Sequence, residues 1–245
     1  MNIMPLEMSR VSAVQAAPRL DLYVGIHKAL RALMADTLLA VGRLDTDDAL
    51  ELAQTSQRVV QLLDFCGGHL THENDFVHPA LEARAPGASE TIAHEHKTHV
   101  QHLASLSALA GELLQSAPAG RAATALALYR QLSLFIADNF QHMHVEETAH
   151  NAVLWSRYTD AELAAIHNAL IASIPPEEMM FTVRWLVPFM NPVERTAMLA
   201  DMRAHAPAPA FAAALETVRP HLTTVEWDKL MRSLELPAVP GLVQG

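Results

Sequence analysis

Apolar residues recur at intervals of three and four along almost the whole of this 245-residue chain, which is the period of an amphipathic helix. No segment of the sequence alternates convincingly between apolar and polar residues, as a half-buried strand would. Aromatic residues make up only 5% of the chain, whereas Ala, Leu and Met are abundant, and this composition also favours helices over strands. The sequence therefore predicts an all-α fold.

Helix-breaking segments divide the first part of the chain into four long helices. The breaks are expected at residues 42–48, 84–87 and 116–120, with Thr46 and Ser89 as the capping residues of the second and third helices. Links this short make successive helices antiparallel neighbours. We therefore expect an antiparallel up-down-up-down four-helix bundle over residues 20–158.

Residues 159–236 are expected to form a C-terminal helical extension. Three capping-box patterns start helices there, which are Thr159 with Glu162, Asn191 with Glu194, and Thr223 with Glu226. The apolar stripe within residues 180–190 is interpreted as packing against the bundle, and the alternative is a surface for a homodimer or a protein partner. Residues 1–19 are interpreted as a flexible leader and residues 237–245 as a tail.

Charge and composition exclude several classes of partner. The net charge of −10 speaks against binding to nucleic acid through its phosphates. No stretch approaches the roughly 18–20 apolar residues of a membrane span, and Pro5, Glu7 and Arg10 stand where a secretory signal needs an apolar run. The single cysteine, Cys66, fits a reducing compartment and is expected to be a small core residue. We expect a cytoplasmic protein with no nucleic-acid or membrane partner.

Histidine and glutamate occupy positions on the inward stripe of each of the four helices. An unpaired carboxylate in a protein core costs several kcal/mol, so buried charges are normally paired or bound to metal. The set therefore predicts cations at the centre of the bundle. Its members are His27 on the first helix, His69 and Glu73 on the second, His96 and His99 on the third, and His142 and Glu146 on the fourth.

The spacing of these residues agrees with a metal site. His69 with Glu73 and His142 with Glu146 are i,i+4 pairs, so each pair presents a nitrogen and an oxygen donor on one helix face. Imidazole and carboxylate donors without thiolates suit iron or manganese, with zinc as a further option. Two residues stay open as ligands: His99 shares the stripe of His96, and Glu147 is an alternative to Glu146, although the i,i+4 geometry favours Glu146.

The remaining bundle histidines are expected on flanking or exposed faces; they are His72, His78, His94, His102, His144 and His150. A ferritin-like di-iron site is the main competing interpretation. It needs Glu-x-x-His on two helices and a single glutamate on each of the other two. Only Glu147 and His150 have that spacing in the bundle, and the first helix has no glutamate. The ferritin-like pattern is therefore not met.

Several segments of the bundle resemble the hemerythrin, or HHE cation-binding, family. They are residues 26–31 (IHKALR), 69–73 (HLTHE) followed by 79–83 (PALEA), 95–97 (EHK) and 142–147 (HMHVEE). The sequence looks most similar to the hemerythrin repeats of plant BRUTUS-type iron-sensing ubiquitin ligases, and residues 173–189 resemble the segment after those repeats. The resemblance implies two iron ions held by six ligands, with both glutamates bridging: His27, His69, Glu73, His96, His142 and Glu146.

The chain departs from oxygen-carrying hemerythrins on the third helix, where Val100 stands four residues after His96 and no His-x-x-x-His pair exists. Six protein ligands would leave open positions for water, a diatomic molecule or peroxide. The first hypothesis is therefore a protein that binds or senses oxygen, nitric oxide, peroxide or iron. The alternatives are a di-iron enzyme that reduces nitric oxide or peroxide, an iron donor for iron–sulfur repair, and a structural or storage metal site. Ubiquitin-ligase activity is not expected, because the chain has no RING segment.

Overall fold

The computed structural model describes residues 19–237, and these residues form helices without any strand. The predicted all-α fold is confirmed. The predicted leader and tail, residues 1–19 and 237–245, lie outside the described residues except for Arg19 and Pro237. Across the described part of the chain, no helix is long and apolar enough to cross a membrane.

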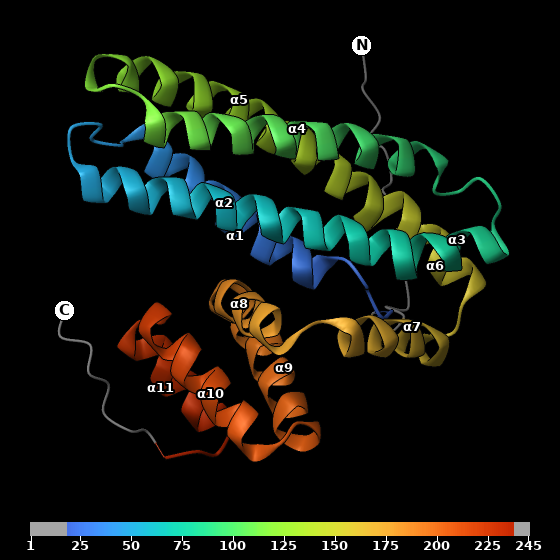
Figure 1. The fold of residues 1–245 in the computed structure, drawn as a ribbon. Helices are drawn as coiled ribbons and strands as arrows, with labels where there is room; N and C mark the ends of the chain where they lie inside the picture. The colour runs from blue at the N-terminus through green and yellow to red at the C-terminus, as the bar shows by residue number, and fades with distance from the viewer. Residues whose placement is uncertain (1–18, 238–245) are drawn as a thin grey trace, which may run out of the picture.

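Four long helical rods form the bundle (Figure 1). They are α1 (Val24–Gly42); α2 (Ala49–His72), continued through a π-helical turn (Glu73–Val77) into α3 (His78–Arg84); α4 (Glu90–Gln115); and α5 (Pro118–Val145), continued through a second π-helical turn (Glu146–His150) into α6 (Asn151–Arg157). The rods contact one another in the ring α1–α2–α4–α5. This ring with its short links is the predicted up-down-up-down bundle.

The start of α2 differs from the prediction. Asp48, not Thr46, caps the helix, since its carboxylate accepts hydrogen bonds from the backbone N–H groups of Leu50 and Glu51 at 2.8 and 3.0 Å. Ser89 does precede α4, but its side chain makes no cap hydrogen bond. Its hydroxyl lies 2.8 Å from a carboxylate oxygen of Glu82 and donates to it instead. In both places the acceptor is a nearby carboxylate, which is a stronger acceptor than the hydroxyl oxygen of Thr46 or Ser89.

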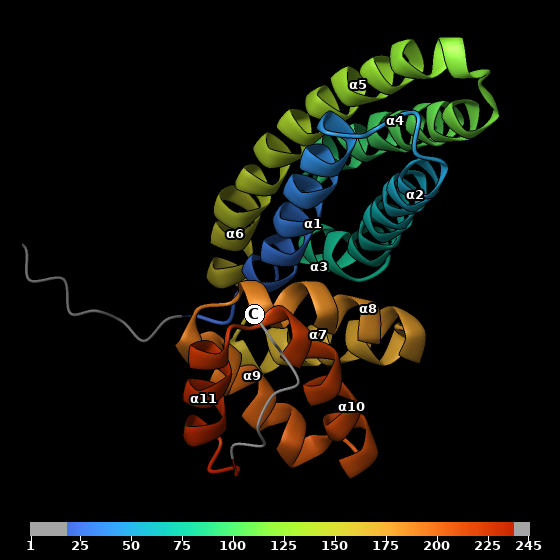
Figure 2. The ribbon, with the colours of Figure 1, turned by 90° about the vertical axis from the view of Figure 1, so that its left-hand side faces the viewer.

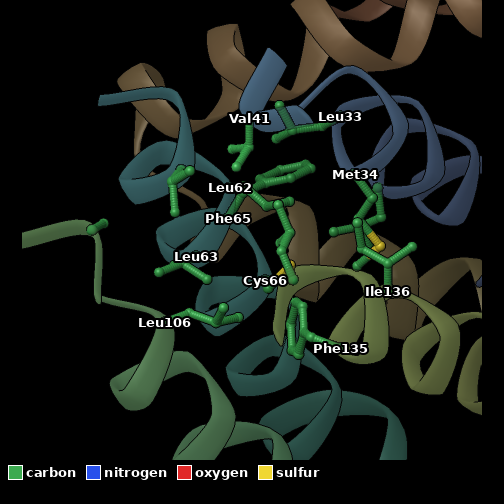
Figure 3. Close-up of a cluster of buried hydrophobic side chains, with 14 of the residues drawn as sticks. Leu33, Met34, Val41, Leu62, Leu63, Phe65, Cys66, Leu106, Phe135 and Ile136 are labelled. Atoms are coloured by element: carbon green, nitrogen blue, oxygen red, sulfur yellow. The ribbon is translucent and has the colours of Figure 1, made fainter. Parts of the chain in front are cut away.

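The half of the bundle next to the α1–α2 and α4–α5 links has an apolar core. Leu33 and Val41 of α1 pack there with Leu62 of α2 and Phe135 of α5 (Figure 3). Cys66 belongs to the same cluster and is buried, as predicted. Burying a side chain of this size contributes about 1.5–3 kcal/mol. This half of the bundle therefore needs no group from outside the chain to complete its core.

The extension consists of α7 (Asp160–Ser173), α8 (Pro176–Leu186), a 3-10 turn (Val187–Phe189), α9 (Pro192–His205), α10 (Ala208–Val218) and α11 (Thr224–Ser233). The three predicted capping boxes, at Thr159, Asn191 and Thr223, are all present. In both views the extension helices lie together on one side of the bundle (Figures 1 and 2).

The apolar stripe of α8 is divided between two cores. Leu186 joins the core of the bundle, together with the neighbouring Trp185. Val183 and Val187 instead belong to a second core within the extension, which also contains Trp227. The expectation that the whole stripe packs against the bundle was therefore only partly right, because α9, α10 and α11 enclose the other side of α8.

Candidate metal centre

The six predicted ligands meet inside the bundle, at the end opposite to the α1–α2 link. Their donor atoms form two groups of four, and within each group all of the atoms lie within 4.8 Å of one another. The side chain of Glu146 is fully buried and that of His69, the most accessible of the six, is 11% exposed. The first group is His27, His69, Glu73 and Glu146, and the second is Glu73, His96, His142 and Glu146.

Both groups share the two glutamates, and each carboxylate directs one oxygen to each group. Glu73 Oε1 lies 3.2 Å from His69 Nε2, while Glu73 Oε2 lies 3.4 Å from His96 Nε2. Glu146 Oε2 lies 3.5 Å from His27 Nε2, while Glu146 Oε1 lies 3.3 Å from His142 Nε2. This is the arrangement that two carboxylates need in order to bridge two adjacent cations.

The inner polar atoms of the centre lack hydrogen bonds among the residues that the structure describes. They are Nε2 of His27 and His69 and both carboxylate oxygens of Glu73 and Glu146. Leaving a buried polar atom unpaired costs about 1–3 kcal/mol, and more for a charged group. Cations bound between these atoms would satisfy all of them, so the residues present fit a metal centre.

Three of the four histidines are oriented by an acceptor on their outer side. His96 Nδ1 lies 2.9 Å from Asn74 Oδ1, His142 Nδ1 lies 2.8 Å from Glu95 Oε2, and His27 Nδ1 lies 3.0 Å from Glu147 Oε1. These oxygens only accept, so each Nδ1 donates its proton and each Nε2 is directed to the interior as a potential metal donor. The Nε2 atoms of His96 and His142 lie 3.1 Å apart, close enough to bind a common cation.

The two residues left open in the sequence both face away from the donor groups. Glu147 accepts from His27 and, at 2.5 Å, from Nη1 of Arg31, so its carboxylate lies on the outer side of His27. The buried His99 directs its Nε2 to Asp138 Oδ2, 2.9 Å away. Neither residue belongs to a group of candidate donors.

Glu73 and Glu146 each stand at the first residue of a π-helical turn, which the sequence did not reveal. A π turn winds one extra residue into the helix, and such turns are frequent at functional sites. It places His78, five residues after Glu73, over the centre, where it is buried and stacks on His96 with ring centroids 4.9 Å apart. Asn151, five residues after Glu146, is buried in the same way.

The expectation that His78 and His150 lie on flanking or exposed faces was therefore wrong. His150 is buried, and its Nδ1 is hydrogen-bonded to the Tyr23 hydroxyl at 3.1 Å. With Glu146, the two histidines make a third cluster of potential donor atoms beside the centre. The burial of His150 could have been predicted from the sequence, because His150 follows Glu146 by four residues and so shares its helix face. The other four histidines lie as expected: His94, His102 and His144 are exposed and His72 is half-buried.

Burial and neighbouring charges shift the pKa values of the donor side chains in the centre. Burial lowers the pKa of His69 to about 3, so its imidazole is neutral and able to bind metal at neutral pH. Burial, together with the charge of Glu73, raises the pKa of Glu146 to about 7. Burial alone would lower the pKa of His142, but Glu146 and Glu95 raise it to about 9. Burial alone would raise the pKa of Glu73, but the neighbouring histidines, His69 above all, lower it well below its usual value.

Comparison with known proteins gives one match. The family model described as the hemerythrin HHE cation binding domain matches residues 19–150, which is more than half of the chain. Searches of curated proteins and of solved structures returned no significant match. The closer similarity to BRUTUS-type repeats stays a prediction, and the extension lies outside the matched residues. The chain belongs to the hemerythrin HHE cation-binding family, and its histidine and glutamate clusters form the metal-binding site of that domain.

Proposed function

We propose that this protein holds two iron ions, bridged by Glu73 and Glu146, and that it binds or senses oxygen, nitric oxide, peroxide or iron. The observation that carries the proposal is the division of each carboxylate between two groups of histidines. In two-metal sites the ions lie about 3.5–4 Å apart, which is compatible with donor groups that share two residues.

The donor chemistry favours iron. All six donors are imidazole nitrogens or carboxylate oxygens, which suit iron or manganese and allow zinc. The only thiol of the chain, Cys66, lies in the apolar core and is absent from the donor groups of the described residues. Iron bound here would supply the redox and ligand-binding chemistry, while the protein sets access and geometry.

Sensing is supported by the connection between the centre and the extension. His27 is followed by Lys28, whose ammonium lies 2.7 Å from Glu194 Oε1 at the start of α9. Trp185 and Leu186 of α8 pack into the core of the bundle. A displacement of α1 on ligand binding would therefore be passed to the extension, where a protein partner or a second copy would read it.

Metal analysis tests the bridging roles directly. Glu73→Gln with Glu146→Gln keeps the size of both side chains and removes their charge. We expect about two irons per chain in the wild type and the loss of at least one in the double variant. The matched control is Glu90→Gln with Glu112→Gln, two exposed glutamates of α4, and it should keep the wild-type content. Equal iron content in both double variants would refute the bridging roles.

Spectroscopy separates sensing from the alternative functions. Addition of nitric oxide or oxygen to the anaerobic ferrous protein should change its near-ultraviolet and visible absorption. Sustained consumption of nitric oxide or peroxide with a reductant would instead identify an enzyme. A colourless zinc-loaded protein that responds to neither gas would identify a structural site. A cytoplasmic location and a partner at the extension remain predictions.

A further inference from the structure

A cavity of about 250 Å³ lies between the bundle and the extension. The bundle contributes residues from the start of α1 and the end of α2, and the extension contributes residues from α7, α8 and α9. The cavity reaches His69 and Glu73, which belong to the metal centre. It therefore adjoins the centre on the side that the extension covers.

The cavity is too large and too apolar to serve only as a passage for water. Side chains of Ile26 and Phe65 line it from the bundle, and Leu170, Met179, Leu186 and Met198 line it from the extension. An apolar cavity of about 150 Å³ is enough to hold benzene. This one has room for a molecule with an aromatic ring or a short alkyl chain, which is much larger than a diatomic gas.

The charge of the lining limits what such a molecule can carry. Three carboxylates line the cavity, those of Asp21, Glu73 and Glu178, and no lysine or arginine is among the described residues that line it. Its other ionisable groups include the imidazoles of His72 and His167. Apart from metal bound in the centre, an anionic ligand would find no permanent cation among the residues that line the cavity, and it would be buried beside their carboxylates, which is strongly unfavourable.

We propose that this cavity is a binding site for a small organic molecule with an apolar body and no negative charge, such as an alcohol or amine bearing an aromatic ring or a short alkyl chain. The molecule lies beside His69 and Glu73. Most of the apolar wall comes from the extension, beyond residues 19–150. The proposed site is thus built jointly by the family domain and by the extension that follows it.

Two glycines provide a matched pair of variants. Gly25 of α1 lines the cavity, and a Cβ atom added there would meet nothing within 4 Å. Gly111 of α4 is also helical and equally open, but it does not line this cavity. Gly25→Phe should therefore fill the cavity without a backbone clash, and Gly111→Phe makes the same chemical change elsewhere. Met179→Trp fills the cavity from the opposite wall as a second, independent variant.

The experiment measures binding of benzyl alcohol, benzylamine and benzoate to the full-length protein as purified, by calorimetry or ligand-observed NMR. Benzyl alcohol and benzylamine should bind saturably, and benzoate, measured after removal of the metal with a chelator, should bind at least about tenfold more weakly. Gly25→Phe and Met179→Trp should each lower the affinity for benzyl alcohol by about tenfold or more, and Gly111→Phe by less than about twofold. Circular dichroism and metal content are recorded for every variant.

Three results would overturn the proposal. They are the absence of saturable binding, benzoate binding as tight as that of benzyl alcohol, and wild-type affinity in both folded cavity-filling variants. The proposal is independent of the identity of the metal. If the purified protein lacked iron but bound benzyl alcohol with the expected dependence on Gly25 and Met179, the proposed di-iron function would fail and this inference would stand.

Discussion

The two halves of the bundle use the same four helices and the same inward stripes in opposite ways. Near the α1–α2 link the stripes carry mainly leucine, valine and phenylalanine, which pack against one another (Figure 3), and the buried polar groups among them are small hydroxyls such as those of Thr37 and Ser56. At the other end the stripes carry imidazoles and carboxylates whose inner atoms lack hydrogen bonds among the described residues. The apolar half is complete as a folded core, whereas the donor half is complete only with cations.

Removal of the metal should cause the largest loss of stability, because the donor half depends on cations and the apolar half does not. Chelation should lower the free energy of unfolding by about 4 kcal/mol relative to protein held at a free metal concentration a thousand times its Kd. The measurement is urea unfolding with and without metal. In Glu73→Gln with Glu146→Gln the two curves should lie much closer together than in the wild type. A wild-type unfolding midpoint that is the same with and without metal would show that the donor half is stable by itself.

A truncation in the apolar half should cost almost as much but should be independent of metal. Leu62 is 0% exposed, and Leu62→Ala should lower the free energy of unfolding by about 3 kcal/mol because it leaves a cavity in the core. The same loss is expected in the loaded and the metal-free protein, since distant sites contribute additively. A different loss in the two states would show that the halves are energetically coupled.

Loss of an outer hydrogen bond should weaken the donor half without removing a ligand. Asn74→Ala deletes the acceptor that orients His96 and should lower metal affinity by about 10–100-fold, measured by competition with a chelator. The control is Asp138→Ala, which deletes the partner of His99 and should leave metal affinity unchanged. An equal loss in the control would mean that His99 takes part in metal binding.

Replacement of the Glu146 carboxylate by a hydrocarbon should stabilise the metal-free protein and destabilise the metal-loaded protein. In the metal-free protein Glu146→Leu should raise the free energy of unfolding by about 1 kcal/mol, because it replaces a buried charged group by an apolar one of similar size. In the presence of metal the same variant should be less stable than the wild type. Destabilisation in both states would show that Glu146 has good partners within the chain.

The smallest expected effect is at the boundary between the halves. Burial raises the pKa of the Cys66 thiol to about 12, against about 8.5 for a free cysteine. The thiol therefore stays protonated, and it contributes stability that is present below the unfolded pKa and is lost as pH rises toward 12. Native protein at pH 8 should not react with a thiol reagent, with or without metal, and urea-unfolded protein should react at once. Reaction after metal removal alone would show that opening of the donor half reaches Cys66.

Periodicity and helix breakers were sufficient to predict the bundle, because four amphipathic helices with short links have few ways to bury their stripes. The same stripes were sufficient to bring the six candidate ligands together, since an inward polar residue on each helix must meet the others at the same depth. His27 and Glu73, which are 46 residues apart in the sequence, lie with Nε2 and Oε1 only 3.8 Å apart.

What could not be predicted depends on local departures from the α-helix. A fixed spacing of three and four residues cannot anticipate a π turn, so His78 was placed on the wrong face. The orientation of Glu147 depends on Arg31 of another helix, a pairing that no local pattern encodes. Thr46 was preferred to Asp48 because both are good capping residues and only the backbone path decides between them.

The two π-helical turns also affect how this sequence must be aligned with others. Each turn contains one residue more than regular winding would use. Deletion of a single residue such as Ala149 would restore regular α-helical winding and would leave the residues after it, such as the buried Leu154, on the same face of the helix. Relatives with an uninterrupted helix at these points should therefore be one residue shorter after the positions of Glu73 and Glu146, and a gap there marks a change of helical winding.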